Sequence, residues 1–314
     1  MNNDARAGRA PGRPKPARRP LGGPADVPVG RGADRYAVLG NPVAHSRSPF
    51  IHAEFARLTG QAVDYGRVLC PLDGFEASIR AFAASGARGC NVTVPFKFEA
   101  PALAAVVSAR ARLAGAANIL AFDTPGWAAD NTDGIGLVRD IEVHAGVALA
   151  CQRVLLIGAG GAGAGVLGPL IAARPAAVTV VNRSPDKALA LVERHRDWAA
   201  QFAVALAAAP MATPGTGYGI VINASSTSLQ GIASPVPAST LAQAALAIDL
   251  MYGAAAAPFL AWAAAAGAVA RDGLGMLVEQ AAEAFFIWRG VRPPTAPVLA
   301  ALRATLATEA AAAR

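Results

Sequence analysis

Residues Val154-Leu155-Leu156-Ile157-Gly158-Ala159-Gly160-Gly161-Ala162-Gly163 decide the fold of this chain. The four apolar residues are typical of a buried parallel strand, and the glycines that follow have the spacing G-x-G-x-x-G. The first glycine permits a tight turn, the second lets backbone approach a diphosphate, and the third lets the next helix pack closely. The N-terminus of that helix presents free N–H groups to phosphate. The stretch therefore predicts a dinucleotide-binding domain.

The residues after the next strand indicate which dinucleotide binds. A strand over 177–181 ends about 20 residues beyond the glycines, where the ribose-reading residue is expected. That position holds Asn182-Arg183-Ser184 instead of Asp or Glu. A carboxylate would accept from a free ribose 2′-hydroxyl and repel a 2′-phosphate, whereas the planar guanidinium of Arg183 can bind the phosphate. We therefore predict NADP(H), rather than NAD(H), as the cofactor.

Length and composition favour two domains and no membrane partner. The chain has 314 residues and is 54% hydrophobic, with alanine supplying much of that fraction. The alanine-rich run 254–270 is the one membrane candidate, but it contains Gly and Pro and lacks the Leu, Ile and Val density of a spanning helix. The N-terminus shows no secretory pattern. We expect a cytoplasmic protein.

The net charge of +7 is concentrated at the N-terminus. Residues 1–34 contain seven Lys or Arg and three Asp, so they contribute +4 of the +7. This Pro-, Gly- and Arg-rich stretch has little to bury, and we predict a disordered tail and no nucleic-acid partner. The three cysteines are unclustered and the four histidines lack ligand spacing, so we expect reduced thiols and no metal site.

Strand and helix patterns alternate on both sides of the glycine stretch, which predicts an α/β architecture. Before it, Ser48-Pro49 suits a helix start, with serine as the cap and proline at the first helical position. The expected strands before the glycine stretch are 36–40, 63–69, 89–94 and 118–122, and the expected helices are 48–58, 73–85 and 95–112. The later strands are expected near 153–157, 177–182, 219–223 and 245–250.

The last segment, 274–313, has a helical pattern and no strand left to pair. We expect it to pack back on the first domain, leaving a cleft between two domains where ligands bind. The predicted organisation is an N-terminal α/β domain of residues 35–133 with 274–314, and a Rossmann-type NADP-binding domain of residues 134–273.

Several motifs in a fixed order now carry a family resemblance, which extends from about Tyr36 to the C-terminal helices. The chain resembles the shikimate dehydrogenases of aromatic amino-acid and chorismate biosynthesis. The motifs are GNPVAHSRSP (40–49), NVTVPFK (91–97), AGAAN (114–118), NTDG (131–134), GAGGA (158–162), NRS (182–184) and GLGMLVEQ (273–280). The resemblance implies reversible reduction of 3-dehydroshikimate to shikimate by NADPH.

The resemblance also assigns substrate roles, each of which has an ordinary alternative. Lys97 alone would pass as a solvated helix lysine, but ketone reduction leaves negative charge on oxygen and needs a nearby proton donor. Asp133, in what could be a simple turn, is implied to hold the ammonium and bond a substrate hydroxyl. Ser46 and Ser48, which could merely cap a helix, are implied to bind the substrate carboxylate. The further implied substrate contacts are Thr93, Asn118, Tyr252 and Gln280.

For the cofactor, the resemblance implies a set of residues around the glycine turn and the ends of later strands. These are Gly158, Ala159, Gly160, Gly161, Ala162, Asn182, Arg183, Ser184, Lys187, Leu250 and Gly273. In one departure, Gly163-Ala164 stand where many members have Ser-Arg or Ala-Arg, which removes one possible phosphate cation.

Two other functions compete with this one. A quinate/shikimate dehydrogenase relative that uses NAD would usually carry an acidic residue in the adenosine-ribose pocket, which Asn182-Arg183-Ser184 lacks. A nucleotide-sensing or nucleic-acid-binding module would need a damaged Lys97/Asp133 pair or a basic face on the folded part, and the sequence shows neither. A homodimer is left open.

Overall fold

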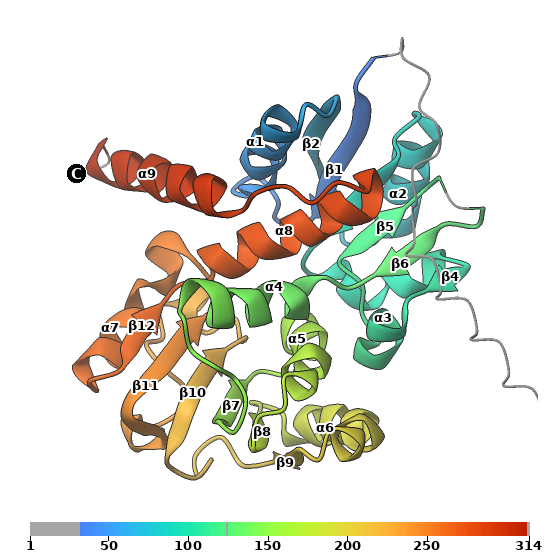
Figure 1. Ribbon diagram of the computed structural model, residues 1–314. Coiled ribbons are helices and arrows are strands. Elements are labelled where there is room, and N and C mark those ends of the chain that lie inside the picture. Colours follow the sequence, from blue (N-terminus) through green and yellow to red (C-terminus); the bar gives the residue numbers. More distant parts are fainter. Residues whose placement is uncertain (1–31, 124, 313–314) are drawn as a thin grey trace, which may run out of the picture.

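Two six-stranded sheets organise the protein in a computed structural model that describes residues 32–123 and 125–312 (Figure 1). We call the first sheet and the helices packed on it the first lobe, and the second sheet with its helices the second lobe. The elements of the first lobe are β1 (Asp34–Gly40), α1 (Ser48–Thr59), β2 (Val63–Leu69), α2 (Phe75–Ala84), β3 (Gly89–Val92), β4 (Val106–Val107), α3 (Ala109–Ala114), β5 (Ile119–Ala121) and β6 (Ala128–Asp130).

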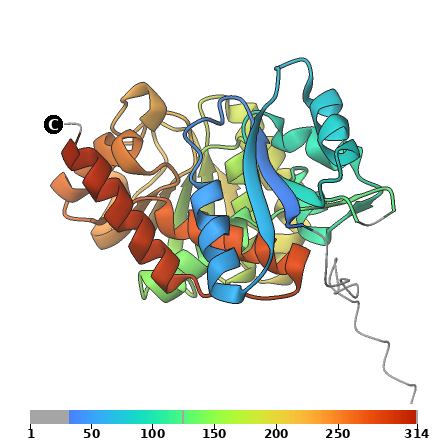
Figure 2. The ribbon, with the colours of Figure 1, turned by 90° about the horizontal axis from the view of Figure 1, so that it is seen from above.

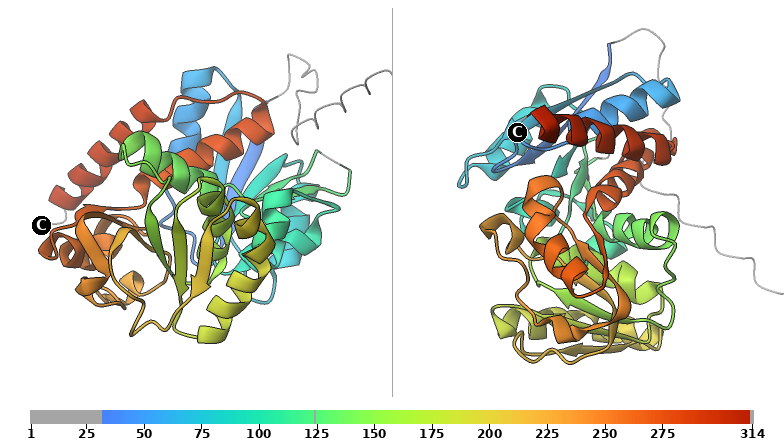
Figure 3. Two further views of the ribbon diagram at one scale, coloured as in Figure 1. Left: turned by 60° about the horizontal axis from the view of Figure 1, so that its bottom comes forward. Right: turned by 90° about the vertical axis from the view of Figure 1, so that its left-hand side faces the viewer.

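Helix α4 (Asp133–Arg139) and a π-helical turn (Asp140–His144) lead into the second lobe. The elements of the second lobe are β7 (Arg153–Ile157), α5 (Gly161–Ala172), β8 (Ala177–Val181), α6 (Pro185–Gln201), β9 (Ala205–Ala208), β10 (Tyr218–Asn223), β11 (Leu241–Asp249), α7 (Ala257–Ala265) and β12 (Val269–Arg271). Two last helices, α8 (Leu274–Arg289) and α9 (Ala296–Ala312), return to the first lobe. Seen from the side, the lobes lie one above the other (Figure 3).

The second sheet has the order β12-β11-β10-β7-β8-β9, with every paired neighbour parallel. The chain therefore starts at the centre with β7, winds outward to β9, and returns to the centre at β10. Ligands bind at the carboxyl ends of strands where the order reverses in this way. Here that point lies between β7 and β10, directly beside the glycine turn. The predicted Rossmann-type sheet is confirmed.

The first sheet is mixed, with the order β2-β1-β3-β5-β6-β4. Strands β1, β2 and β3 run parallel, and β5 is antiparallel to both β3 and β6. The four predicted strands before the glycine stretch are present here, and β2 has the predicted limits. Because β3 is parallel to β1 in the middle of the sheet, the residues after both strands reach the same edge.

The predicted return of the C-terminal segment is confirmed. Helix α9 lies beside α1, and α8 lies beneath both (Figure 2). Ile51 and Phe55 of α1 share a buried cluster with Phe285 of α8 and Leu302 of α9. We propose residues 35–133 with 274–314, and residues 134–273, as the two domains, because each set builds one sheet.

The predicted helix over residues 95–112 is wrong. The segment forms two 3₁₀ turns (Phe96–Phe98 and Ala100–Leu103), the short strand β4, and only then helix α3. Pro101 has no N–H to donate within a continuous helix, and the β-branched pair Val106-Val107 joins β6 instead. The sequence analysis also missed β6, β9 and β12, whose short alanine-containing stretches carry little strand preference.

Two smaller expectations also need correction. Ser48 does not cap α1, because the helix begins at Ser48 and the capping position belongs to Arg47. The hydroxyl of Ser46 instead accepts the Ser48 N–H, at 3.3 Å. The first strand begins two residues earlier than the predicted 36–40, because Asp34 belongs to β1 and forms ion pairs with Arg88 and Arg289. Most of the predicted tail, residues 1–31, lies outside the described residues.

None of the helices in the described part of the chain combines the length and apolarity of a membrane span. The same residues contain no group of three or more His, Cys, Asp or Glu side chains arranged to hold a metal ion. The three cysteines are free thiols: Cys70 and Cys90 are buried, and Cys151 is exposed.

His52 of α1 is fully buried and predicts acid sensitivity. Its ring stacks on Tyr65 at 4.1 Å between centroids. Burial lowers the pKa of His52 from 6.5 to about 3, against a smaller opposing effect of Asn91. Below pH 6.5, His52 therefore binds fewer protons in the folded protein than in the unfolded chain. The contribution of His52 to the free energy of unfolding is complete above that pH and falls as the pH drops.

The loss of unfolding free energy that this one histidine causes cannot exceed about 1.4 kcal/mol per pH unit, or about 2 kcal/mol between pH 6.5 and about pH 5. We expect His52→Phe to remove this part of the acid sensitivity, as measured by urea unfolding at both pH values. The exposed His45 provides the control variant His45→Phe. Equal acid sensitivity of His52→Phe and the wild type would contradict the prediction.

Candidate active site

A buried ion pair between Lys97 and Asp133 lies at the centre of the site. Lys97 stands in the 3₁₀ turn that follows β3, and Asp133 is the first residue of α4. Lys97 Nζ donates to Asp133 Oδ2 at 2.6 Å, and the two side chains are only 14% and 5% exposed. An ammonium held in this way keeps a proton available at a fixed place, which a general acid requires.

Glycines explain why Asp133 can be held so closely. A Cβ on Gly134 would meet the carbonyl of Gly165 at 2.7 Å, and one on Gly136 would meet Gln280 at 2.7 Å. On the opposing helix, a Cβ on Gly165 would lie 3.0 Å from Asp133 Oδ2. The absence of these side chains lets α4 pack directly between α5 and α8, which places Asp133 at the boundary of the two lobes.

An amide network surrounds Asp133 Oδ1, the carboxylate oxygen that does not accept from Lys97. Asn118 Nδ2 donates to Asp133 Oδ1 at 2.9 Å and lies 3.1 Å from Gln280 Oε1. Asn118 Oδ1 accepts the Thr132 N–H at 2.8 Å. The structure thus brings together three predicted site residues, Asn118, Asp133 and Gln280, from three separate segments of the chain. Thr132 is an addition that the sequence analysis did not single out.

The serine pair lies at the start of α1. Ser46 Oγ donates to Ser48 Oγ at 3.2 Å, and Arg67 Nη2 donates to the Ser46 carbonyl at 2.6 Å. Tyr252 packs against the buried cluster that contains Ile51 and Phe55 of α1. Ser46 and Ser48 therefore contact each other, and Tyr252 packs against the helix that Ser48 begins. The described contacts contain no hydrogen bond from these three to the Lys97–Asp133 pair.

A second pair of buried residues, missed in the sequence, lies between the serines and the amide network. Tyr65 O–H donates to Asn91 Oδ1 at 2.6 Å, and Asn91 Nδ2 donates to the carbonyl of Asn118 at 3.2 Å. Burial raises the pKa of Tyr65 well above its ordinary value, with Ser48 working in the opposite direction. Asn91 is the first residue of the NVTVPFK motif that ends at Lys97, and this position could have identified it as a site residue. No feature of the sequence identified Tyr65.

Thr93 lies between β3 and Lys97, and its methyl group packs against Gly40, where any side chain would collide with it. The Thr93 N–H donates to the carbonyl of Leu39 at 2.9 Å. These contacts place Thr93 at the sheet edge shared by the residues that follow β1 and β3. Its hydroxyl has no hydrogen bond to another described site residue.

The glycine turn has the geometry that the spacing predicts. Gly158 has φ +110°, which side chains rarely adopt, and any Cβ on Gly163 would collide with the carbonyl of Gly158. Nothing lies within 4 Å of a Cβ placed on Gly160. The turn is therefore closed on the protein side and open on the side where a diphosphate would approach. Gly161 and Ala162 continue from it as the first residues of α5.

Asn182 ties this turn to the next strand end. Its Oδ1 accepts the Ala159 N–H at 3.1 Å, and its Nδ2 donates to the carbonyl of Ser184 at 3.0 Å. Ser184 precedes α6 as its N-cap residue, and Arg183 stands exposed between the two. The predicted cofactor residues of the two segments thus form one connected surface.

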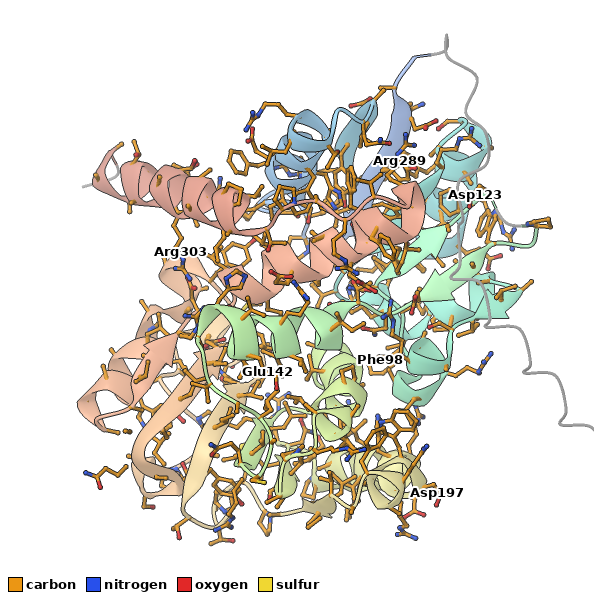
Figure 4. The ribbon with its side chains drawn as sticks, viewed as in Figure 1. Phe98, Asp123, Glu142, Asp197, Arg289 and Arg303 are labelled. Atoms are coloured by element: carbon orange, nitrogen blue, oxygen red, sulfur yellow. The ribbon has the colours of Figure 1, made fainter. Side chains whose placement is uncertain are left out.

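A groove of about 250 Å³ lies between the lobes next to this surface. The glycine turn contributes Ala159 and Gly160, and α6 contributes Lys187 and Arg194. Phe98 and Ala114 of the first lobe line the other side. Figure 4 labels Phe98 at the border of the lobes. Arg194 was missed in the sequence, although it lies seven residues after Lys187 and so falls on the same helix face.

Leu250 and Gly273 meet each other at the carboxyl ends of β11 and β12. A Cβ on Gly273 would collide with the Leu250 carbonyl. Beneath them, Asn223 Nδ2 donates to Asp249 Oδ2 at 3.1 Å, and Asp249 Oδ1 accepts the Met251 N–H at 2.8 Å. Burial raises the pKa of Asp249. This network holds the chain on both sides of Leu250 in place.

The two halves of the site adjoin at Lys97. A Cβ on Gly161 would lie 3.2 Å from Lys97 Cβ and 3.5 Å from its Cδ. The stem of the lysine from the first lobe therefore packs against the glycine turn of the second lobe. Neither lobe alone contains both Lys97 and the glycine turn.

Three family profiles match the chain. Residues 38–120 match the shikimate dehydrogenase substrate binding domain, residues 142–232 match shikimate / quinate 5-dehydrogenase, and residues 273–303 match the shikimate 5′-dehydrogenase C-terminal domain. Among curated proteins, the shikimate dehydrogenase (NADP(+)) of Methylibium petroleiphilum is 64% identical over 279 residues, which cover 87% of this chain and 95% of the relative.

Solved structures of similar proteins resemble this chain over the same part of its length. The crystal structure of an Ael1 enzyme from Pseudomonas putida is 45% identical, with a TM-score of 0.77, covering 86% of this chain and 98% of that one. Shikimate 5-dehydrogenase from Thermus thermophilus, solved with NADP(H) and shikimate, is 32% identical, with a TM-score of 0.73 and the same two coverages. With its two lobes, its glycine turn and these relatives over nearly nine-tenths of its length, the chain belongs to the shikimate dehydrogenase family.

Proposed function

We propose that this protein is an NADP-dependent shikimate dehydrogenase that reversibly reduces 3-dehydroshikimate to shikimate. The observation that carries the proposal is the buried Lys97–Asp133 pair, whose lysine stem packs on the glycine turn. A proton donor and a site for a hydride carrier are the two requirements of ketone reduction, and here they adjoin. Relatives named as NADP(+) shikimate dehydrogenases support the cofactor and the substrate.

The residues present fit the cofactor. Gly160 leaves open space for a diphosphate, and the Ala159 N–H and Asn182 lie beside it. Arg183, Ser184 and Lys187 are exposed at the position for a ribose 2′-phosphate. No acidic residue occurs among residues 182–184, and the one carboxylate of the segment is the exposed Asp186, next to Lys187. Leu250 and Gly273 would flank the nicotinamide. When bound, NADPH supplies the hydride.

The substrate is then held mainly by residues of the first lobe, with Tyr252 contributed by the second lobe. The Ser46 and Ser48 hydroxyls, with Tyr252 beside them, bind its carboxylate, and Thr93, Asn118, Asp133 and Gln280 bond its hydroxyl groups. Lys97 Nζ lies at the ketone oxygen and donates a proton to it as negative charge develops there. In shikimate oxidation the same nitrogen takes the proton back. Asp133 holds the ammonium in position throughout.

The direct test follows nicotinamide absorbance with purified protein, shikimate and NADP⁺. We expect rapid NADPH formation, and much slower reaction when quinate replaces shikimate or NAD⁺ replaces NADP⁺. Comparable rates with NAD⁺ and quinate would instead identify the quinate/shikimate relative. Absence of reduction with every pair of substrate and dinucleotide would overturn the proposed function.

Arg183→Ala tests the cofactor preference. The guanidinium is proposed to bind the 2′-phosphate, which NADPH has and NADH lacks. We expect the Kd of NADPH to rise about 10- to 100-fold, the loss of one charge-assisted contact, and the Kd of NADH to stay within about twofold. Fluorescence titration of both dinucleotides measures this. Equal losses for NADPH and NADH would contradict the assignment of Arg183 to the 2′-phosphate.

A further inference from the structure

Arg194 stands out in the interlobe groove because its charge has no acidic partner in the part of the chain that the structure describes. It lines the groove with Lys187, and no ion pair of either side chain occurs within the described residues. The neighbouring Arg196, in contrast, is paired with Glu193 on the exposed side of the same helix. A groove that holds two cations and no carboxylate among its lining residues favours an anion.

The guanidinium of Arg194 reaches across to the first lobe. Its Nη1 donates to the carbonyl of Ala114 at 3.1 Å. It fills the space where a side chain at Gly115 would stand, since a Cβ there would lie 3.0 Å from Arg194 Cζ. Gly115 has φ +63° and so suits glycine in any case. One carbonyl satisfies few of the N–H donors of an arginine, and the rest remain available to a ligand.

The position of the guanidinium relates it to the dinucleotide turn. Helix periodicity aligns Lys187, Leu191 and Arg194 along the face of α6 that borders the groove. Ala159, Gly160 and Ala164, at the turn and the first turn of α5, line the same groove. The small side chain of Ala164 leaves this wall uncharged, so α6 supplies the cations.

We infer that Arg194 is a phosphate-binding residue for the dinucleotide, an inference that rests on the proposed function. A planar guanidinium binds phosphate oxygens through paired hydrogen bonds, and the exposed Arg194 is accessible to such a ligand from the groove. The phosphate is either the ribose 2′-phosphate or the diphosphate, which share this chemistry. Arg194 thereby connects dinucleotide binding to the first lobe through Ala114.

The test compares Arg194→Met with the matched control Arg196→Met in the full chain. Met preserves most of the side-chain length and removes the charge. We expect the Kd of NADPH to rise about 10- to 100-fold for Arg194→Met, less for Arg194→Lys, and not beyond about twofold for Arg196→Met. A loss confined to NADPH assigns the 2′-phosphate, and an equal loss for NADH assigns the diphosphate.

The dependence of Kd on salt concentration distinguishes phosphate binding by the charge of Arg194 from a purely structural role of this side chain. Binding through a cation weakens as salt rises, so the variant should lose affinity chiefly at low salt. A lower Tm with unchanged Kd for both dinucleotides, or a loss of affinity that is the same at low and high salt, would overturn the inference. If the wild-type protein fails to bind NADPH, the proposed function falls as well. Wild-type binding with an unaffected Arg194→Met variant overturns this inference alone.

Discussion

Replacing Lys97 by methionine is expected to lower kcat about 10²- to 10⁴-fold while KM for shikimate changes little. The substitution removes the proposed proton donor and keeps the aliphatic stem that packs on Gly161. Since the proton moves in the transition state, its loss raises the barrier more than it weakens ground-state binding. Steady-state kinetics in both directions measure the effect.

The control for this variant is dinucleotide binding. Because the stem and the glycine turn stay in contact, Lys97→Met should bind NADPH with a Kd near that of the wild type. A variant with near-normal kcat would remove Lys97 from its role as general acid. A variant that fails to bind NADPH would show that the lysine acts mainly through the glycine turn.

Asp133→Asn is expected to lower kcat about 10²- to 10³-fold, and to raise KM for shikimate as well. The carboxylate accepts from Lys97 Nζ and from Asn118 Nδ2 at the same time. An amide offers only one acceptor atom, so one of these donors would face an NH₂ group and lose its bond. The ammonium then loses its fixed position, and the substrate hydroxyl proposed to bind Asp133 loses its partner.

Kinetics combined with thermal unfolding distinguish this loss from misfolding. Glu142, an exposed carboxylate in the π-helical turn after α4, provides the matched control Glu142→Gln (Figure 4). That variant should keep wild-type kinetics. If Asp133→Asn retained normal kcat and KM, the ion pair would be structural only.

Helix α9 adds a further connection between the lobes, beside the contacts of Lys97 with Gly161 and of Arg194 with Ala114. Arg303 donates to Asp272, directly before Gly273, at 3.1 Å (Figure 4). Near the end of the same helix, Glu309 accepts from Arg47 Nη1 at 2.9 Å, between the two serines. The C-terminal helix thus contacts the segments proposed to hold the substrate carboxylate and the nicotinamide.

Patterns within single segments were enough for much of this protein. The glycine spacing predicted the turn at Gly158, and alternation of strand and helix predicted the two α/β layers. Local pattern failed over residues 95–112, where Pro101 and the pairing of Val106-Val107 with β6 outweighed a run that resembled a helix. It also failed at Ser48, where the hydroxyl of the preceding Ser46 approaches the helix start.

The sequence by itself determined the dinucleotide turn, the absence of an acidic residue at the ribose position, and the motif order of the family. Those features are local, because turn geometry and residue chemistry depend on neighbours in the chain. Only the tertiary structure decided that Lys97 meets Asp133, that Asn118 joins Gln280, and that Arg194 reaches Ala114. These contacts join residues far apart in sequence, and close helix packing at Gly134, Gly136 and Gly165 brings the first two together.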